Sequence, residues 1–195
     1  MNYLAHIYLA RHSEEAMVGA LLGDFVKPSA DGQFSAAIAA EIMRHRRIDS
    51  FTDSHRHVLA AKQLFVGPSR RYAGILLDVF YDHLLARAWL SYCDEPLDAF
   101  VARFYDALRR HAAILPPQLA GAMERMIEQD WLGSYRQYEG VEVAIRRTSQ
   151  RLSKNGDLLR AGLVDLKANY DALGAGFDLF FPELIDFVAA QRAAR

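Results

Sequence analysis

A single cysteine, Cys93, is present among the 195 residues of the chain. One thiol cannot form an internal disulfide, and it cannot supply the several thiolates of a structural zinc site. Such sparse cysteine is typical of a reducing compartment, so we expect a cytoplasmic location. Any metal site in this chain therefore has to use imidazole and carboxylate groups.

Neither sign of charge is in excess, because 23 lysines and arginines face 24 aspartates and glutamates and the net charge is −1. This balance indicates neither a nucleic-acid nor a membrane partner, and an acidic partner would require a local basic patch. The first ten residues have no basic segment and contain His6 within an apolar run. They predict a first helix rather than a signal peptide or a membrane span.

Alternation of polar and apolar residues, the mark of a half-buried strand, is missing from the sequence, as are internal repeats and low-complexity tracts. The sequence also contains no Walker loop, no dinucleotide-binding glycine motif after a strand and no nucleophile elbow, which argues against nucleotide-binding and serine-hydrolase mechanisms. The composition, 52% hydrophobic and 24% charged, is that of a globular protein. We predict one all-α domain over residues 1–195, a bundle of about seven to nine helices.

Cap, loop and proline signals divide the chain into these helices. Ser13 precedes two glutamates and predicts a helix that continues to about Gly23, and another helix is expected over about 35–52. A break at 67–69 precedes a long apolar helix over about 70–91. Further signals are a loop at 27–32, helix starts at Pro96 and at Pro116 or Pro117, a turn at 154–157, and a final helix restarting at Pro182.

The apolar helix contains the most informative feature of the sequence, two carboxylates and an imidazole. Asp78 and Asp82 are four residues apart and lie on one face of a helix, and His83 is the next residue. A buried carboxylate is costly unless it is paired, hydrogen-bonded or bound to a metal. These residues therefore predict either a metal site or buried ion pairs with Arg46 or Arg47.

Three other segments carry groups of the same kind. His45 and Asp49 are four residues apart on their predicted helix, Asp24 follows the helix before it, and His6 lies in the first helix, either at the site or as a core histidine. Imidazole and carboxylate ligands without thiolate suit Mn²⁺, Mg²⁺, Fe²⁺ or Zn²⁺, and carboxylate-rich sets favour Mn²⁺ or Mg²⁺. Arg46 and Arg47 directly follow His45, where a guanidinium can bind a phosphate group.

A family resemblance is carried by several motifs in the same order along the chain. They are MNYLAH at 1–6, GDF at 23–25, HRRID at 45–49 followed by TD at 52–53, LDVFYDH at 77–83, NYDAL at 169–173 and FFP at 180–182. The chain resembles the bacterial acyl carrier protein phosphodiesterase family from its first residue to about Leu184. That family is itself similar to the all-helical HD-type metal phosphohydrolases, although Asp82-His83 reverses the His-Asp order of the HD pattern.

The resemblance implies an enzyme that uses a divalent metal, typically Mn²⁺, to hydrolyse holo acyl carrier protein to the apo protein and 4′-phosphopantetheine. The metal ligands would come from Asp24, His45, Asp78 and Asp82. Catalytic roles would fall to Arg46 and Arg47, which offset charge on the phosphate, and to His6, Asp49 and His83, which orient a ligand or move the proton.

Carrier proteins are acidic, so the resemblance also implies a positive docking face. Its candidates are Arg70 and Arg71 or the group Arg146, Arg147 and Arg151. No residue pattern indicates an oligomeric state.

Three other functions are compatible with the same residues. One is an HD-like phosphohydrolase that acts on a nucleotide or another small phosphoester. The second is a helical metal-binding or interaction protein without catalysis. The third is a purely structural bundle in which the acidic residues pair with arginines. Arginines beside His45 favour phosphate chemistry over metal storage.

Overall fold

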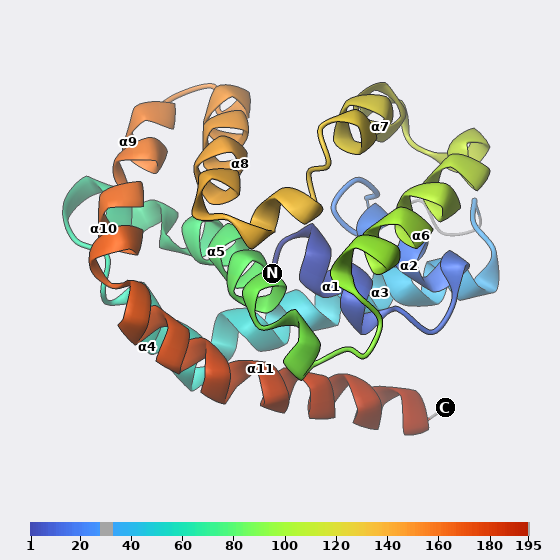
Figure 1. Ribbon diagram of the computed structural model, residues 1–195, viewed down its shortest axis with the longest axis horizontal. Helices are drawn as coiled ribbons and strands as arrows, with labels where there is room; N and C mark the ends of the chain where they lie inside the picture. The colour runs from blue at the N-terminus through green and yellow to red at the C-terminus, as the bar shows by residue number, and fades with distance from the viewer. Residues whose placement is uncertain (28–32, 195) are drawn as a thin grey trace.

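Helices form most of the computed structural model, which describes residues 1–27 and 33–194 (Figure 1). The all-α fold is confirmed. The α-helices are α1 Tyr3–Leu9, α2 Glu14–Leu22, α3 Ala36–Ser54, α4 Arg56–Lys62, α5 Ala73–Arg87, α6 Leu97–Arg110, α7 Pro117–Glu128, α8 Tyr138–Arg151, α9 Gly156–Ala161, α10 Leu163–Ala168 and α11 Tyr170–Ala193. The short 3₁₀ segments are η1 Gly67–Tyr72, η2 Trp89–Ser91, η3 Ala112–Ile114 and η4 Gly133–Arg136.

Serine caps begin α2, which ends just before Asp24, and α3, which carries His45 and Asp49. The hydroxyl of Ser13 accepts a hydrogen bond from the backbone N–H of Ala16 at 3.1 Å, and Ser35 does the same for Ile38 at 3.4 Å. A serine cap satisfies an N–H that has no partner within the first turn. Both predicted starts are confirmed, since α2 begins one residue after Ser13 and α3 one residue after Ser35.

Proline and asparagine mark three further boundaries that the sequence predicted. Helix α6 begins directly after Pro96, and Pro117 is the first residue of α7, where its missing N–H costs nothing. In the predicted turn at 154–157, Asn155 has a φ of 61° and α9 begins at the next residue. The predicted loop at 27–32 lies, apart from Lys27, outside the described residues.

The apolar segment is shorter as a helix than predicted and is divided into three pieces. The segment η1 precedes it, α5 spans Ala73–Arg87, and η2 follows. Similar short breaks separate α9, α10 and α11. At Gly162, between α9 and α10, an added Cβ would lie 2.2 Å from Cδ1 of Leu76, so the chain approaches α5 closely there. These breaks give eleven α-helices within the described residues, close to the seven to nine predicted.

The predicted restart at Pro182 is wrong, because α11 continues through this residue. A proline inside a helix removes one backbone hydrogen bond and crowds the carbonyl four residues earlier, at a cost of about 3 kcal/mol. Pro182 is on the exposed side of α11, whereas Phe177, Phe180 and Phe181 on the other side are fully buried or nearly so. Burial of this apolar face outweighs the local cost.

Helix α1 lies in the middle of the molecule, and the N-terminus lies beside α5 (Figure 1). Helix α1 packs against α2 and α5, α2 packs along α3, and α11 runs past α4, α3 and α5. One hydrophobic core joins these elements and extends from Met1 to Val188. A central first helix means that its polar residues face other helices rather than solvent.

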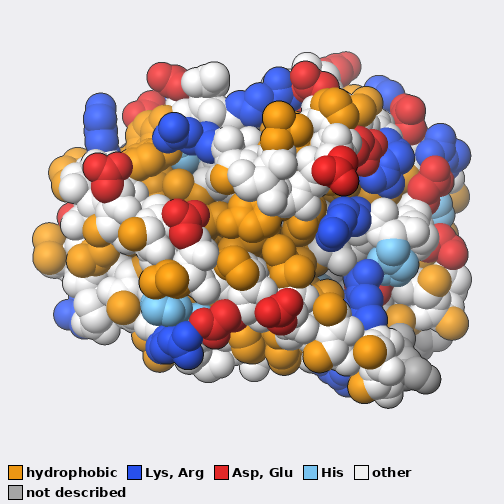
Figure 2. Space-filling model, turned by 60° about the horizontal axis from the view of Figure 1, so that its bottom comes forward, with side chains coloured by type: hydrophobic (Ala, Val, Ile, Leu, Met, Phe, Trp, Pro, Cys, Tyr) orange, Lys and Arg blue, Asp and Glu red, His pale blue; other side chains and the backbone are white. Residues whose placement is uncertain are grey.

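Figure 2 turns the side with α4 and α11 toward the viewer. Hydrophobic side chains form a band across the middle of this face, and acidic and basic side chains surround it. None of the helices in the described part of the chain is long and apolar enough to cross a bilayer.

Replacement of Pro182 by alanine should stabilise the protein by about 1–3 kcal/mol, because the backbone N–H returns to a helix that is already formed. Urea unfolding followed by circular dichroism measures this change. Pro117→Ala is the matched control, and at the first position of α7 it should leave stability unchanged or lower it slightly. Equal effects of the two substitutions would contradict this account of α11.

Candidate metal centre

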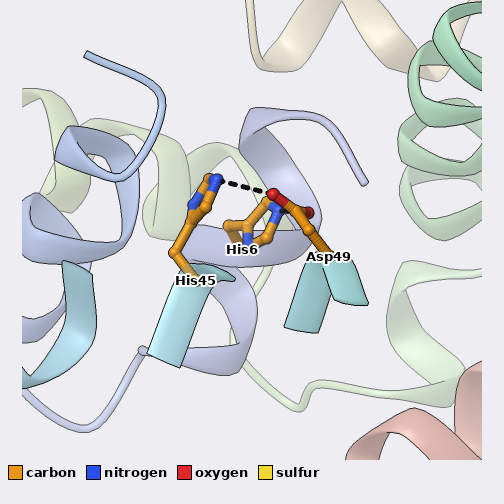
Figure 3. A group of neighbouring side chains, drawn as sticks. All are labelled: His6, His45 and Asp49. Atoms are coloured by element: carbon orange, nitrogen blue, oxygen red, sulfur yellow. Dashed lines mark hydrogen bonds and ion pairs between the residues drawn. The ribbon is translucent and has the colours of Figure 1, made fainter. Parts of the chain in front are cut away.

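Two histidines from different helices meet at one aspartate (Figure 3). His6 comes from α1, and His45 and Asp49 are one turn apart on α3. The Nε2 atom of His6 lies 3.0 Å from Oδ1 of Asp49, and Nε2 of His45 lies 3.1 Å from Oδ2. One ligand atom from each of the three residues falls within 4.8 Å of the others. This spacing allows a single ion to bind all three.

The two imidazole rings are buried, while the aspartate faces solvent on one side. The rings stack with their centroids 3.7 Å apart. The side chain of His6 is fully buried and that of His45 is 3% exposed, whereas that of Asp49 is 40% exposed. The centre is therefore rigid on the protein side and accessible to water or a substrate on the other.

The ring of His45 is fixed by the end of α2. Its Nδ1 donates a hydrogen bond to the backbone oxygen of Ala20 at 2.7 Å, which leaves Nε2 directed at Asp49 and Asp24. A carbonyl bound to the other ring nitrogen is a common way to orient a histidine ligand. An added Cβ on Gly23 would lie 2.2 Å from Cγ of His45, so only glycine allows the chain to pass this close to the ring.

Asp24 and Asp78 complete the rim of the centre. Oδ1 of Asp24 lies 3.5 Å from Nε2 of His45. Oδ1 of Asp78 accepts a hydrogen bond from the amino group of Met1 at 2.8 Å, and the same amino group lies 3.6 Å from Oδ1 of Asp49. The side chains of Asp24 and Asp78 are 39% and 40% exposed. Asp24 therefore stands beside His45, and Asp78 is linked to Asp49 through the Met1 amine.

Positive charge on the protein itself balances these carboxylates. Burial disfavours the charged form of His45, but hydrogen bonds to Asp24 and Asp49 outweigh it and raise its pKa to about 9. Burial opposes the charge of the Met1 amine as well, yet Asp78 and Asp49 raise its pKa to about 10. Burial and the neighbouring His45 lower the pKa of His6 to about 4, so its ring is neutral at pH 7.

This donor set fits a divalent cation. A positive charge, the proton of His45, lies among the carboxylates where a metal ion would bind. The group offers imidazole nitrogen and carboxylate oxygen without sulfur, a combination that suits Mn²⁺, Fe²⁺ or Zn²⁺. His6 also has a buried Nδ1 atom without a hydrogen-bond partner. His6, His45 and Asp49, with Asp24 and Asp78 at the rim, are thus the residues that would bind the metal.

Asp82 was expected among the metal ligands, and the structure gives it another position. Its carboxylate is completely buried under α1 and accepts hydrogen bonds from the backbone N–H groups of Leu4 at 2.8 Å and Ala5 at 3.0 Å. Burial raises its pKa to about 7, against the lowering effect of these two hydrogen bonds. Both oxygens are engaged in attaching α1 to α5, so we do not retain Asp82 as a ligand.

His83 faces away from the centre, and its two ring nitrogens are both bonded. Nδ1 donates to the backbone oxygen of Tyr135 and Nε2 accepts from the hydroxyl of Tyr170, each at 2.7 Å. Arg87 in turn donates to that hydroxyl. His83 therefore belongs to a separate buried network between α5, η4 and α11, where it cannot move a proton at the centre.

The two arginines beside His45 point outward. Arg46 donates to the backbone oxygen of Val26 at 3.0 Å, and Arg47 is exposed. Neither forms an ion pair with Asp78 or Asp82 in the described part of the chain, because Asp78 binds the Met1 amine and Asp82 binds backbone N–H groups. The alternative of buried ion pairs between these residues is therefore wrong.

Sequence reasoning missed the start of α1 as part of this region. The ring of Tyr3 stacks on that of Phe25, the residue directly after Asp24, with centroids 6.2 Å apart. Asn2 donates to the hydroxyl of Tyr135 at 2.5 Å. The signal was present in the motifs at 1–6 and 23–25, which join aromatic and amide residues to the site residues His6 and Asp24.

The comparisons with known proteins agree with one another. A family model described as "Acyl carrier protein phosphodiesterase" matches residues 1–184. The chain is 34% identical over 186 residues to proteins of that name from Escherichia coli O139:H28 (strain E24377A / ETEC), O9:H4 (strain HS) and strain K12 / DH10B. These alignments cover 95% of this chain and 96% of each relative. No solved structure matches the chain, so the likeness to HD-type folds stays a prediction.

Removal of the Asp82 carboxylate should destabilise the fold, because two buried N–H groups of α1 lose their acceptor. We expect Asp82→Ala to lower the free energy of unfolding by about 2–4 kcal/mol, as measured by urea denaturation. The control is Asp53→Ala, which removes an exposed ion pair with Lys62 and should cost less than about 1 kcal/mol. If Asp82→Ala were as mild as the control, Asp82 would not be the residue that attaches α1.

Proposed function

Because this chain belongs to the acyl carrier protein phosphodiesterase family, we propose that it hydrolyses the phosphodiester that links 4′-phosphopantetheine to a serine of holo acyl carrier protein. We further propose that the reaction depends on a divalent metal, most simply Mn²⁺, bound at the centre around His45 and Asp49. The products are apo acyl carrier protein and 4′-phosphopantetheine. The observation that supports this proposal is the convergence of His6, His45 and Asp49 on one partly open site.

The reaction adds water across the bond between phosphorus and the serine oxygen. The oxygen of water becomes the new phosphate oxygen, and the serine oxygen leaves and regains a proton. A bound divalent metal supplies a water of lowered pKa and polarises the phosphoryl oxygen. The protein residues supply the orientation of the groups that react.

Each residue of the centre has a role that its contacts support. The Ala20 carbonyl holds the Nδ1 proton of His45, so that its Nε2 faces the metal position. His6 is neutral, and its Nε2 lies 3.0 Å from Oδ1 of Asp49, so these two residues would bind the metal together. Asp24 and Asp78 are exposed and lie at the rim, where they can accept a proton from water or return one to the leaving oxygen.

Arg46 and Arg47 have weaker support as phosphate ligands. Arg46 is bound to the Val26 carbonyl beside α2, and no contact in the described residues joins either guanidinium to Asp24, His45 or Asp49. We propose no catalytic role for His83, which is occupied by Tyr135 and Tyr170. The reaction as proposed therefore rests on groups from α1, α3, the end of α2 and Asp78 of α5.

Purified holo acyl carrier protein, incubated with this protein and Mn²⁺, should lose the mass of phosphopantetheine, and a chelator should prevent the loss. Intact-mass spectrometry measures this change directly. His45→Ala should abolish the reaction and keep a normal far-ultraviolet circular dichroism spectrum, whereas His57→Ala, a histidine of α4 outside the centre, should leave it unchanged. Normal turnover by His45→Ala would refute the assignment of the centre.

Gly23→Ala tests whether the position of His45 matters to the reaction. The new Cβ would overlap the imidazole ring and displace it, and a shift of about 1 Å at a catalytic group can lower the rate about 100-fold. We expect that loss in kcat/KM, together with weaker Mn²⁺ binding in calorimetry. Gly176→Ala in α11 is the control, because an added Cβ there meets no atom within 4 Å. A rate that matches this control would show that the contact at Gly23 is not needed.

A further inference from the structure

A narrow cleft opens beside the candidate centre, between the start of α1 and the exposed side of α8. Its walls include Asn2, which precedes α1, Tyr3 at the start of α1, Trp131, and the α8 residues Arg147, Thr148 and Arg151. The cleft itself holds only about 30 Å³, whereas the hollow beside it, lined by Arg125, Arg147 and Arg151, holds about 210 Å³, which admits a side chain but not a helix about 10 Å across. The hollow is therefore suited to a single side chain of a larger ligand, and the cleft connects it to the start of α1.

The cleft and the centre share the first residues of the chain. Asn2 follows Met1, whose amine lies between Asp78 and Asp49. Burial raises the pKa of Tyr3, the charge of Asp24 raises it further, and a hydrogen bond with Arg151 opposes this. The Tyr3 side chain thus interacts with a residue of the centre and with an arginine of the cleft. A ligand in the cleft would be next to the reacting phosphate.

Arginines gather at this cleft from two helices. Arg147 and Arg151 are one turn apart on α8, and Arg125 of α7 lines an adjoining hollow with both of them. The guanidinium of Arg147 lies over the ring of Trp131, 4.3 Å from its centroid, and donates to Gln129 at 2.9 Å. These contacts hold Arg147 in place and leave its charge uncompensated.

No ion pair within residues 1–27 and 33–194 joins Arg125, Arg147 or Arg151 to a carboxylate. On neighbouring α6 the situation differs, because Arg103 pairs with Glu95 at 2.8 Å and Arg110 with Glu14 at 2.6 Å. Burial lowers the pKa of Arg147, and the charge of a Tyr135 phenolate would raise it. The like charges of Arg151 and Arg125 lower this pKa further. Three uncompensated guanidinium groups held close together form a site for an anion.

We propose that the arginine cleft, defined by Arg125, Arg147 and Arg151, binds a carboxylate side chain from an acidic segment of the protein substrate, close to the serine that carries the phosphodiester. This inference rests on the proposed function, since it requires a polypeptide substrate. Arg125 of α7 and Arg151 of α8 are exposed, so the positive charge spreads over the surface of two helices. A charged surface of this extent fits an acidic polypeptide better than a small ion. Of the arginines that the sequence offered for docking, this proposal selects Arg147 and Arg151.

Binding can be measured apart from catalysis with apo acyl carrier protein, which has the polypeptide but no phosphodiester. Isothermal titration calorimetry should show that wild-type protein binds it and that added salt weakens the complex. The double substitution Arg147→Glu and Arg151→Glu should lower the affinity about tenfold or more and remove most of the salt dependence. The same variant should show a raised KM for holo acyl carrier protein.

The matched control reverses two charges elsewhere, at Arg70 and Arg71 of η1, and should bind as wild type does. If Arg147→Glu disturbs folding, as judged by circular dichroism and melting temperature, Arg125→Glu with Arg151→Glu replaces it, because both residues are exposed. Affinity that falls only in the Arg70 and Arg71 variant, or in neither, would overturn the proposal. So would binding of inorganic phosphate but not of the carrier protein.

The mass measurement on wild-type protein separates the two proposals. If the protein hydrolyses holo acyl carrier protein but the arginine variants bind the carrier as wild type does, the docking role of the arginine cleft is refuted. The enzyme assignment then stands. Absence of both hydrolysis and carrier binding in the wild type removes the proposed function, and the cleft assignment with it.

Discussion

The buried carboxylate of Asp82 is the interaction on which the arrangement of the site depends. It accepts the backbone N–H groups of Leu4 and Ala5 and so attaches the first turn of α1 to the middle of α5. This attachment fixes the direction of α1, and the direction of α1 places His6 against His45 and Asp49 of α3. It also carries Met1 to Asp78 and Tyr3 to the rim of the arginine cleft. The Asp82 carboxylate lies outside the centre, and yet it determines where the side chains of the centre meet.

Opposite charges lie side by side on the two sides of that first turn. Asp24, Asp49 and Asp78 make one side negative, and the proton on His45 together with the Met1 amine balances part of that charge. Arg125, Arg147 and Arg151 make the other side positive without a carboxylate partner in the described residues. Under the proposed function, the arginines would attract the acidic surface of the substrate, and a cation bound at the carboxylates would allow its phosphate to approach them. The two sides would then be complementary parts of one binding surface for the proposed substrate.

Much of the fold followed from local rules. Serine caps predicted the starts of α2 and α3, and proline predicted those of α6 and α7, because these effects depend only on neighbouring residues. The same rule failed at Pro182, where the buried phenylalanines of α11 outweigh the local cost of proline. For the site, four-residue spacing correctly placed His45 and Asp49 on one face of α3. The same spacing could not tell that Asp78 faces the centre while Asp82 faces the backbone of α1.

The sequence by itself determined the all-α class, most of the helix starts, the supply of imidazole and carboxylate groups, and the family. These depend on composition, on residues near one another along the chain, and on motifs in a fixed order. Only the tertiary structure decided that His6 joins His45 and Asp49 and that His83 turns toward Tyr170. It also decided that Arg147 and Arg151 of α8 line a cleft with Asn2 and Tyr3 at the start of α1. The physical reason is that burial of α1 between α2 and α5 is a property of the whole core. Contacts between residues far apart in sequence follow from how helices pack, and no local pattern encodes them.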